Sequence, residues 1–394
     1  MSDISKTEST EPKSAIPEVP FGVNEMRLDG RQWLVSLFLF VALAVAIPQI
    51  WKRAERFDVG PDYRIPYSLS TDYWLYQKRL EKLTDRSQVP VLGDSVIWGE
   101  YVRKDGTLTH FLDKESGRTG EFINGGVNGA FPLALEGLTS SYCGALHDRK
   151  VILHYNMLWM SSPKADLSTP EEETFNHSAL VPQLFTPIPC YRADATARLN
   201  AVAVRSIDLL GWVNHIDTVY FDQRSIPLWT LEQDSSDPPK SPNAWRNPIA
   251  QIHWSVPEEP DVDPQRGPTS ARHRAWNGKG AEPTHFEWVG TQSSLQWKAF
   301  LRTVDTLRGR HCDVLVILGP FNESMVAPDQ QPTYRELRDG IAASLRARRI
   351  AAIVPAVLPS NLYADASHPL TDGYALLAGR IYHDPEFQRW LTSR

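Results

Sequence analysis

The chain has 394 residues, of which 42% are hydrophobic, and a formal net charge of -6 at pH 7. This composition is typical of a globular protein with a sizeable core. The acidic balance, and the lack of a Lys/Arg stripe interleaved with aromatic residues, argue against nucleic acid as a partner.

The first 51 residues predict a tail followed by a membrane anchor. Residues 1–32 are rich in Ser, Thr, Glu and Pro, which predicts a disordered tail. Residues 33–51, WLVSLFLFVALAVAIPQIW, carry no charge, are long enough to cross a hydrocarbon core and have Trp at both ends. We predict one transmembrane helix there. A cleaved signal peptide is the alternative, because Ala44-Val45-Ala46 resembles a cleavage site, although the preceding tail is long for a signal peptide.

Charged residues on either side of this span leave its orientation open. Arg27 and Arg31 precede it, whereas Lys52, Arg53 and Arg56 follow it.

The remainder of the chain alternates strand and helix patterns. Residues 52–88 are expected to form a linker and a leading helix, with helical spacing over 71–85. Short apolar runs predict interior strands at 89–92, 150–156, 312–320 and 349–358, and helical patterns occupy 295–309, 334–349 and 371–382. This alternation predicts an α/β domain over 89–394, with a mostly parallel sheet covered by helices on both faces.

Residues 160–290, rich in Pro, Trp and Ser, interrupt this alternation. We interpret them as a large insertion that serves a function or forms its own subdomain, with one predicted helix at 197–216.

Cysteine and histidine spacing gives no metal or cofactor signature. Cys143, Cys190 and Cys312 are far apart, so they form neither a CxxC metal site nor a dense disulfide framework; one pair could be oxidised in an exported protein. Cys143 and Cys312 adjoin apolar sequence and are predicted to be core residues. The 11 histidines show no HExxH spacing. We therefore predict no metal and no cofactor.

Four patches contain the groups that acyl transfer by a serine requires. Gly93-Asp94-Ser95 follows the first predicted strand, at the sheet edge where ligands of parallel sheets bind. Asp365 stands three residues before His368 in DASHPLTDGY, as an acid that orients a base. The glycine-rich NGGVNGAF offers backbone donors, with Gly129 preferred, and Asn156 ends the 150–156 strand. We expect these four patches to converge.

The pattern resembles the SGNH, or GDSL-like, hydrolases, over about 89–160 and 310–385. The resemblance implies a flavodoxin-like three-layer α/β/α fold. It also implies that Ser95 is the nucleophile, with His368 as base and Asp365 as its partner. The oxyanion hole would be formed by the Ser95 N–H, Gly129 and Asn156. The third motif block departs from the family's usual G-x-N-D, because His154 replaces the Gly and Met157 the Asp.

Each of these residues could instead have a purely structural role. Ser95 could cap the helix that follows, and Asn156 could satisfy neighbouring backbone groups. Asp94 is expected to support its turn, since His368 is better suited to act as a base. Glu323 either lines the site or faces solvent.

The resemblance implies a membrane-anchored esterase or O-acyltransferase that forms an acyl-enzyme. The anchor, the insertion and the divergent third block of this chain are similar to those of bacterial SGNH proteins. Those proteins act beside membrane-bound O-acyltransferases on exported polysaccharides. The implied substrate is an acylated envelope glycan. The implied location is the bacterial inner membrane, with the tail at 1–32 in the cytoplasm and the catalytic domain outside it. A module of this fold that binds or scaffolds without catalysis is the alternative.

Overall fold

The computed structural model describes residues 28–57, 59–83, 85–170, 176–184, 188–232, 246–258 and 274–393. The chain divides into two compact units, Met1–Ile47 and Pro48–Arg394. Most of the predicted tail at 1–32 lies outside the described residues.

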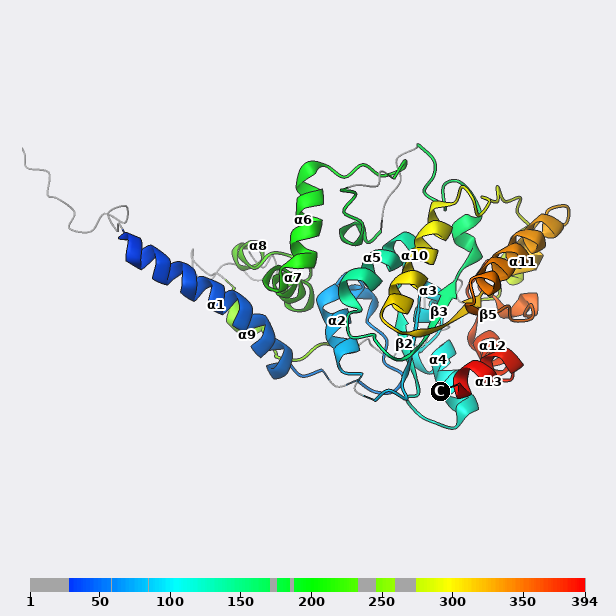
Figure 1. Ribbon diagram of the computed structural model, residues 1–394, viewed down its shortest axis with the longest axis horizontal. Helices are drawn as coiled ribbons and strands as arrows, with labels where there is room; N and C mark the ends of the chain where they lie inside the picture. The colour runs from blue at the N-terminus through cyan, green and yellow to red at the C-terminus, as the bar shows by residue number, and fades with distance from the viewer. Residues whose placement is uncertain are drawn as a thin grey trace, which may run out of the picture. The chain divides into compact units, whose positions relative to one another are not determined.

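The elements of the described residues follow each other in the order labelled in Figure 1. The strands are β1 (Val89–Gly93), β2 (Phe122–Gly126), β3 (Lys150–Tyr155), β4 (Asp313–Leu318) and β5 (Ala351–Ile353). The α-helices are α1 (Gly30–Ala54), α2 (Tyr73–Glu81), α3 (Ser95–Trp98), α4 (Leu108–Ser116), α5 (Pro132–Tyr142), α6 (Ala195–Ser206), α7 (Asp208–Tyr220), α8 (Ile226–Leu231), α9 (Pro248–Gln251), α10 (Leu295–Gly309), α11 (Gln331–Ala347), α12 (Thr371–Tyr382) and α13 (Pro385–Thr392).

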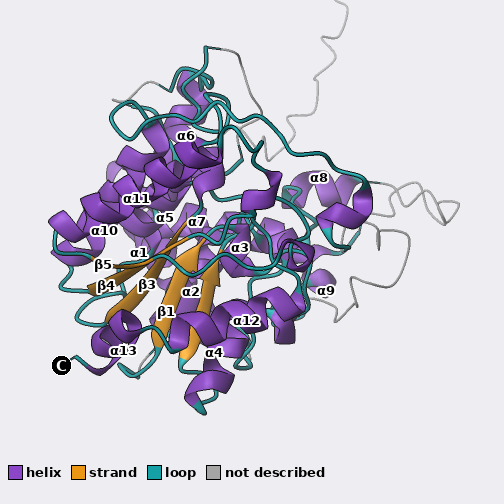
Figure 2. Ribbon diagram, turned by 90° about the vertical axis from the view of Figure 1, so that its right-hand side faces the viewer, coloured by secondary structure: helices purple, strands orange, loops and turns teal. Residues whose placement is uncertain are grey.

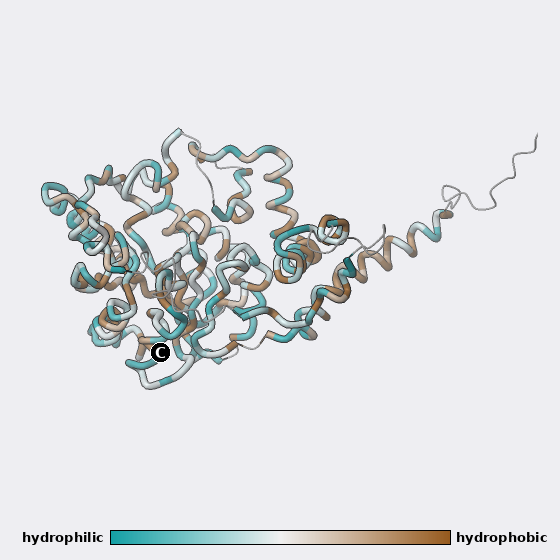
Figure 3. The backbone as a smooth tube through the Cα atoms, turned by 180° about the vertical axis from the view of Figure 1, so that it is seen from behind, coloured by the Kyte–Doolittle hydropathy of each residue, from teal (hydrophilic) through white to brown (hydrophobic). Residues whose placement is uncertain are grey.

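Helix α1 carries the predicted span. Its start is fixed by a capping box, in which Gln32 N–H donates to Asp29 Oδ1 at 2.8 Å and Asp29 N–H donates to Gln32 Oε1 at 2.9 Å. Within the described residues, α1 is the one helix long and apolar enough to cross a membrane, a property that it shares with export signals. Its apolar stretch is visible in Figure 3.

The five strands form one parallel sheet in the order β2-β1-β3-β4-β5. This is the flavodoxin-like order of doubly wound sheets, in which the strand order reverses between β1 and β3. The predicted α/β class with a parallel sheet is therefore confirmed. The ligand-binding crevice of such sheets lies beyond the carboxyl ends of the strands at this reversal.

Helices cover both faces of the sheet, as Figure 2 shows. Alternate strand residues point to opposite faces, so Leu153 and Val316 pack in one core with α5 and α10, whereas Ile152 and Leu315 pack in the other with α4 and α12. Both clusters consist of buried apolar side chains, which support the strand ends from either face.

The expected single helix at 197–216 is wrong, because the chain breaks at Ile207 into α6 and α7. Ile207 has extended backbone angles (φ -119°, ψ 105°). Its N–H closes α6 by donating to Ala203 O, and its own carbonyl starts α7 by accepting from Leu210 and Gly211. In the described part of the insertion, residues such as Leu180 and Ile188 join the core that lies over α5 and α10.

A buried ionic cluster joins the segment after α1 to α2 and α7. His215 Nε2 lies 2.9 Å from Glu55 Oε1, and His215 Nδ1 lies 2.6 Å from Asp72 Oδ2. Lys78 Nζ and the Tyr220 hydroxyl each donate to Glu55 at 2.6 Å. Burial alone would lower the pKa of His215, but the two carboxylates raise it to about 9. The cluster is therefore charge-balanced, with two anions and two cations.

Replacing His215 by Leu is expected to destabilise the fold by about 3–5 kcal/mol, because two buried carboxylates lose their shared cation. The raised pKa means that the contribution of His215 is complete below pH 6.5 and is lost as the pH rises through about 9. Chemical denaturation of the full chain in detergent, at pH 6 and above pH 9, measures both effects. The control His383→Leu changes an exposed histidine and should cost less than about 0.5 kcal/mol. Equal losses for the two variants would contradict this role.

Candidate active site

Ser95 lies directly beyond the carboxyl end of β1, in the turn that leads into α3. Asp94 is the N-cap of α3 and accepts the Val96 N–H at 3.0 Å, so Ser95 is the first helical residue and not the cap. Gly93 permits this tight turn. A Cβ at Gly93 would lie 2.5 Å from Ile97 Cγ1 and 2.9 Å from His154 Cβ, both of which are buried. Any larger residue would force these neighbouring groups to shift.

The loop before α12 brings a histidine and a carboxylate to Ser95. Ser95 Oγ lies 2.8 Å from His368 Nε2, although 273 residues separate them in the chain. His368 Nδ1 lies 2.8 Å from Asp365 Oδ2. Asp365 Oδ1 also accepts the backbone N–H groups of Ser367 and His368, each at 2.9 Å. The carboxylate thus holds both the ring and the loop that presents it.

These bonds determine where the imidazole proton lies. A carboxylate only accepts, so His368 Nδ1 carries the proton and Nε2 is free to accept from the Ser95 hydroxyl. Burial lowers the pKa of His368, but Asp365, with help from Glu100 and Asp94, raises it above its ordinary value of 6.5. Burial raises the pKa of Asp365, but the His368 ring and the backbone N–H groups of Ser367 and His368 together lower it below its ordinary value. The arrangement favours a His368 ring that takes up a proton from Ser95.

A second carboxylate approaches the same imidazole from the turn that follows α3. Glu100 Oε2 lies 3.6 Å from His368 Nε2. The next residue, Tyr101, has a left-handed φ of 66° and places its ring edge-on to the His368 ring, with centroids 5.4 Å apart. A non-glycine residue with this φ is strained, and strain of this kind is concentrated at functional sites.

Asp94 is bound from the carboxyl end of β3. Its Oδ2 accepts Asn156 Nδ2 and Trp159 Nε1, each at 2.9 Å, and His154 Nδ1 lies 3.3 Å from its Oδ1. Burial by itself would raise the pKa of Asp94, but the nearby His154 and the Asn156 and Trp159 donors lower it to about 2. Asp94 is therefore an ionised support for the turn, as the sequence predicts.

Two backbone donors face no partner. Within the part of the chain that the structure describes, the N–H groups of Ser95 and Gly129 make no hydrogen bond. Gly129 has a φ of 72°, which favours glycine, and its loop is tied to the serine turn by a bond from Val127 N–H to Gly93 O at 3.0 Å. Asn156 uses one amide proton on Asp94, which leaves a second available.

Hydrogen bonds thus join Ser95, His368 and Asp365. A further hydrogen bond joins Asn156 to Asp94. The oxyanion roles of Gly129 and Asn156 stay predictions. Glu323 does not face solvent, because its side chain is buried in ion pairs with Arg335 and Arg338.

Sequence reasoning did not identify Glu100 or Trp159. The signal for Glu100 was its position one residue after Gly99, which ends α3 with a left-handed turn. The signal for Trp159 was its position three residues after Asn156.

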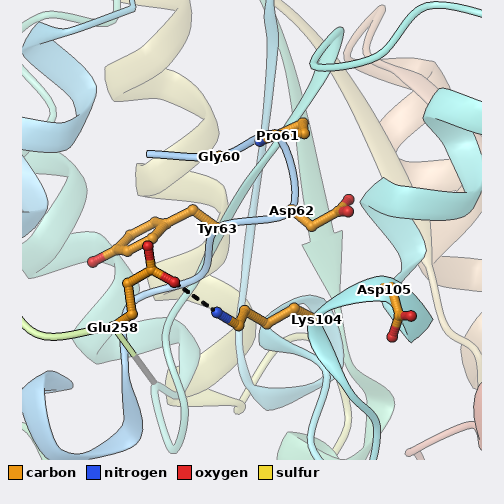
Figure 4. Close-up of a pocket in the computed structure, with 7 residues that line it drawn as sticks. All are labelled: Gly60, Pro61, Asp62, Tyr63, Lys104, Asp105 and Glu258. Atoms are coloured by element: carbon orange, nitrogen blue, oxygen red, sulfur yellow. Dashed lines mark hydrogen bonds and ion pairs between the residues drawn. The ribbon is translucent and has the colours of Figure 1, made fainter. Parts of the chain in front are cut away.

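A separate open pocket of about 430 Å³ contains none of these residues (Figure 4). Its lining combines acidic side chains with Lys104, which is paired to Glu258 at 3.3 Å. Across the described residues, no three His, Cys, Asp or Glu side chains gather as a metal site would require. Cys143 and Cys312 are buried free thiols, as their apolar neighbours predict, and Cys190 is also buried.

The chain was compared with known families and with characterised proteins, and it matches no family model and no characterised sequence.

Proposed function

We propose that the protein is a membrane-anchored serine esterase or O-acyltransferase of the SGNH type. The observation that supports this proposal most is the chain of hydrogen bonds from Asp365 through His368 to Ser95. It lies where the strand order of the sheet reverses. A hydroxyl, a base and an orienting acid in this order are the parts of a catalytic triad. The N–H groups of Ser95 and Gly129, for which the described residues show no hydrogen-bond partner, would supply the remaining requirement, an oxyanion hole.

In the proposed first half-reaction, Ser95 Oγ attacks the carbonyl carbon of an ester while its proton passes to His368 Nε2. Asp365 stabilises the imidazolium through Nδ1, and Glu100 lies close enough to Nε2 to add to this. The N–H groups of Ser95 and Gly129 and the second amide proton of Asn156 donate hydrogen bonds to the carbonyl oxygen. These bonds stabilise the negative charge that develops on it. The C–O bond to the leaving alcohol then breaks, and that alcohol takes the proton from His368.

In the second half-reaction, the acyl-enzyme is attacked by water or by a sugar hydroxyl, which gives its proton to His368. The tetrahedral intermediate collapses, the proton returns to Ser95 Oγ, and a carboxylic acid or a new ester leaves. Water as acceptor makes the protein an esterase. A sugar hydroxyl makes it an acyltransferase.

The motif resemblance suggests the substrate class and the location. It favours an acylated, most simply acetylated, envelope or exported polysaccharide, with a membrane-bound O-acyltransferase as partner. It also favours a catalytic domain outside the bacterial inner membrane, held there by α1.

Incubation of the full chain with p-nitrophenyl acetate, with and without de-acetylated oligosaccharide, tests the proposal. Release of p-nitrophenolate accompanied by free acetate alone indicates an esterase. Acetylated oligosaccharide, detected by mass spectrometry together with slow acetate release, indicates a transferase. If the chain neither releases p-nitrophenolate nor acetylates sugar, the enzymatic proposal is wrong and a binding role is favoured.

A further inference from the structure

A histidine in the insertion is bonded to the loop that carries Gly129. His177 Nε2 lies 2.8 Å from the backbone carbonyl of Asn128, and His177 Nδ1 lies 2.9 Å from the Tyr73 hydroxyl. Both His177 and Tyr73 are buried. The bonds therefore connect α2, the insertion and the loop after β2.

The chemistry of the partners fixes the protons in this arrangement. A backbone carbonyl only accepts, so His177 Nε2 carries the proton and donates to Asn128 O. Burial lowers the pKa of His177, which favours the neutral ring, and its Nδ1 then accepts from Tyr73. Burial also raises the pKa of Tyr73 far above its usual range, so the hydroxyl keeps its proton and donates it.

Anchoring the Asn128 carbonyl also orients the Gly129 N–H, because both belong to one planar peptide unit. In a trans peptide, the C=O and the following N–H point in opposite directions. The bond from His177 thus holds the Gly129 N–H pointing away from His177. Asn176 and His177 also limit the space beside the Gly129 Cα. A Cβ on Gly129 would lie 3.3 Å from Asn176 Nδ2 and 3.7 Å from His177 Nε2.

We propose that His177 is a positioning residue that aims the Gly129 N–H at the oxyanion, and that Tyr73 keeps His177 in the required tautomer. This inference depends on the proposed function, because the oxyanion forms only if Ser95 attacks an ester. It gives the insertion a defined role in catalysis. The insertion supplies a side chain that pre-organises the site without touching substrate.

The test compares His177→Leu, His177→Gln and Tyr73→Phe in the full chain, with p-nitrophenyl acetate as substrate. His177→Leu removes the donor and should lower kcat by about 10- to 100-fold with little change in KM, somewhat less than outright loss of an oxyanion donor. His177→Gln retains an amide N–H that can donate to Asn128 O and should recover most of the activity. Tyr73→Phe removes the hydroxyl that donates to His177 Nδ1. It should lower kcat less than His177→Leu does, again with little change in KM.

A second readout separates positioning from a general loss of structure. Phenylboronic acid forms a tetrahedral adduct with a serine nucleophile, so its Ki should rise in parallel with the fall in kcat. The control His110→Leu removes a partly buried histidine that is bonded to Asp62, and it should leave both kcat and Ki unchanged.

The outcomes distinguish this inference from the proposed function. An active wild-type chain with unchanged kcat and Ki in Tyr73→Phe and His177→Leu would overturn the role of His177 and leave the triad intact. If His177→Leu does not fold, Tyr73→Phe and His177→Gln decide the question by the same two readouts. A wild-type chain that neither hydrolyses the ester nor binds the boronate would overturn the proposed function, and this inference with it.

Discussion

Ser95→Ala is expected to lower kcat/KM for p-nitrophenyl acetate by about 10⁴- to 10⁶-fold, the range seen when a triad nucleophile is removed. The variant keeps the Ser95 backbone N–H, so an ester should still bind. Its fold should also be intact, because Asp94, and not Ser95, caps α3. The denaturation midpoint is therefore expected to stay close to that of the wild type. An unchanged midpoint would mean that kcat/KM falls because the nucleophile is missing and not because the fold is lost.

Ser367→Ala is the matched control for this variant. Ser367 is buried next to His368, and its side-chain oxygen has no partner in the described part of the chain. It helps to hold the loop only through its backbone N–H, which donates to Asp365. Its replacement should leave the rate within about threefold of the wild type. Activity that survives Ser95→Ala, or falls equally in both variants, would contradict the assignment of the nucleophile.

Asp365→Asn is expected to lower kcat/KM by about 10²- to 10⁴-fold while preserving the loop. The Asn oxygen can still accept the backbone N–H groups of Ser367 and His368. The amide nitrogen takes the place of Oδ2 beside His368 Nδ1, and an amide N–H can only donate. The ring then changes tautomer and presents a proton on Nε2, where it can no longer take one from Ser95.

The pH dependence of kcat/KM gives this prediction a second measurement. The neutral form of His368 acts as base, so activity should be lost as the pH falls through its pKa. Asp365 contributes most to raising that pKa above 6.5, against the lowering caused by burial. In Asp365→Asn the acid limb should therefore move to lower pH. Asp372→Asn, at an exposed carboxylate in the first turn of α12, is the control. Identical acid limbs in wild type and Asp365→Asn would contradict the proposed pair.

Apolar runs were sufficient to predict four of the strands because buried parallel strands are apolar on both faces. Strand β2 was missed, since its sequence FINGG looks like a turn. The structure gives the reason for its glycines: a Cβ at Gly126 would meet the Trp98 backbone N at 2.2 Å, so α3 packs directly on the strand. Only the pairing of β2 with β1 makes this segment a strand.

The triad residues were predictable from sequence because Asp365 and His368 are close in the chain and Ser95 follows a strand. His177 was not, because its role depends on a contact with Asn128, 49 positions away, and on its own left-handed φ of 58°. Such a contact leaves no local pattern. The break at Ile207 was hidden for a related reason, since the apolar spacing continues across it.

Covalent labelling of the full chain with a fluorophosphonate tests the central claim most directly. We expect one adduct per chain, located on Ser95 by peptide mapping and absent from Ser95→Ala, with slower labelling of Asp365→Asn. No adduct on the folded wild-type chain, or an adduct on another residue that persists in Ser95→Ala, would contradict it.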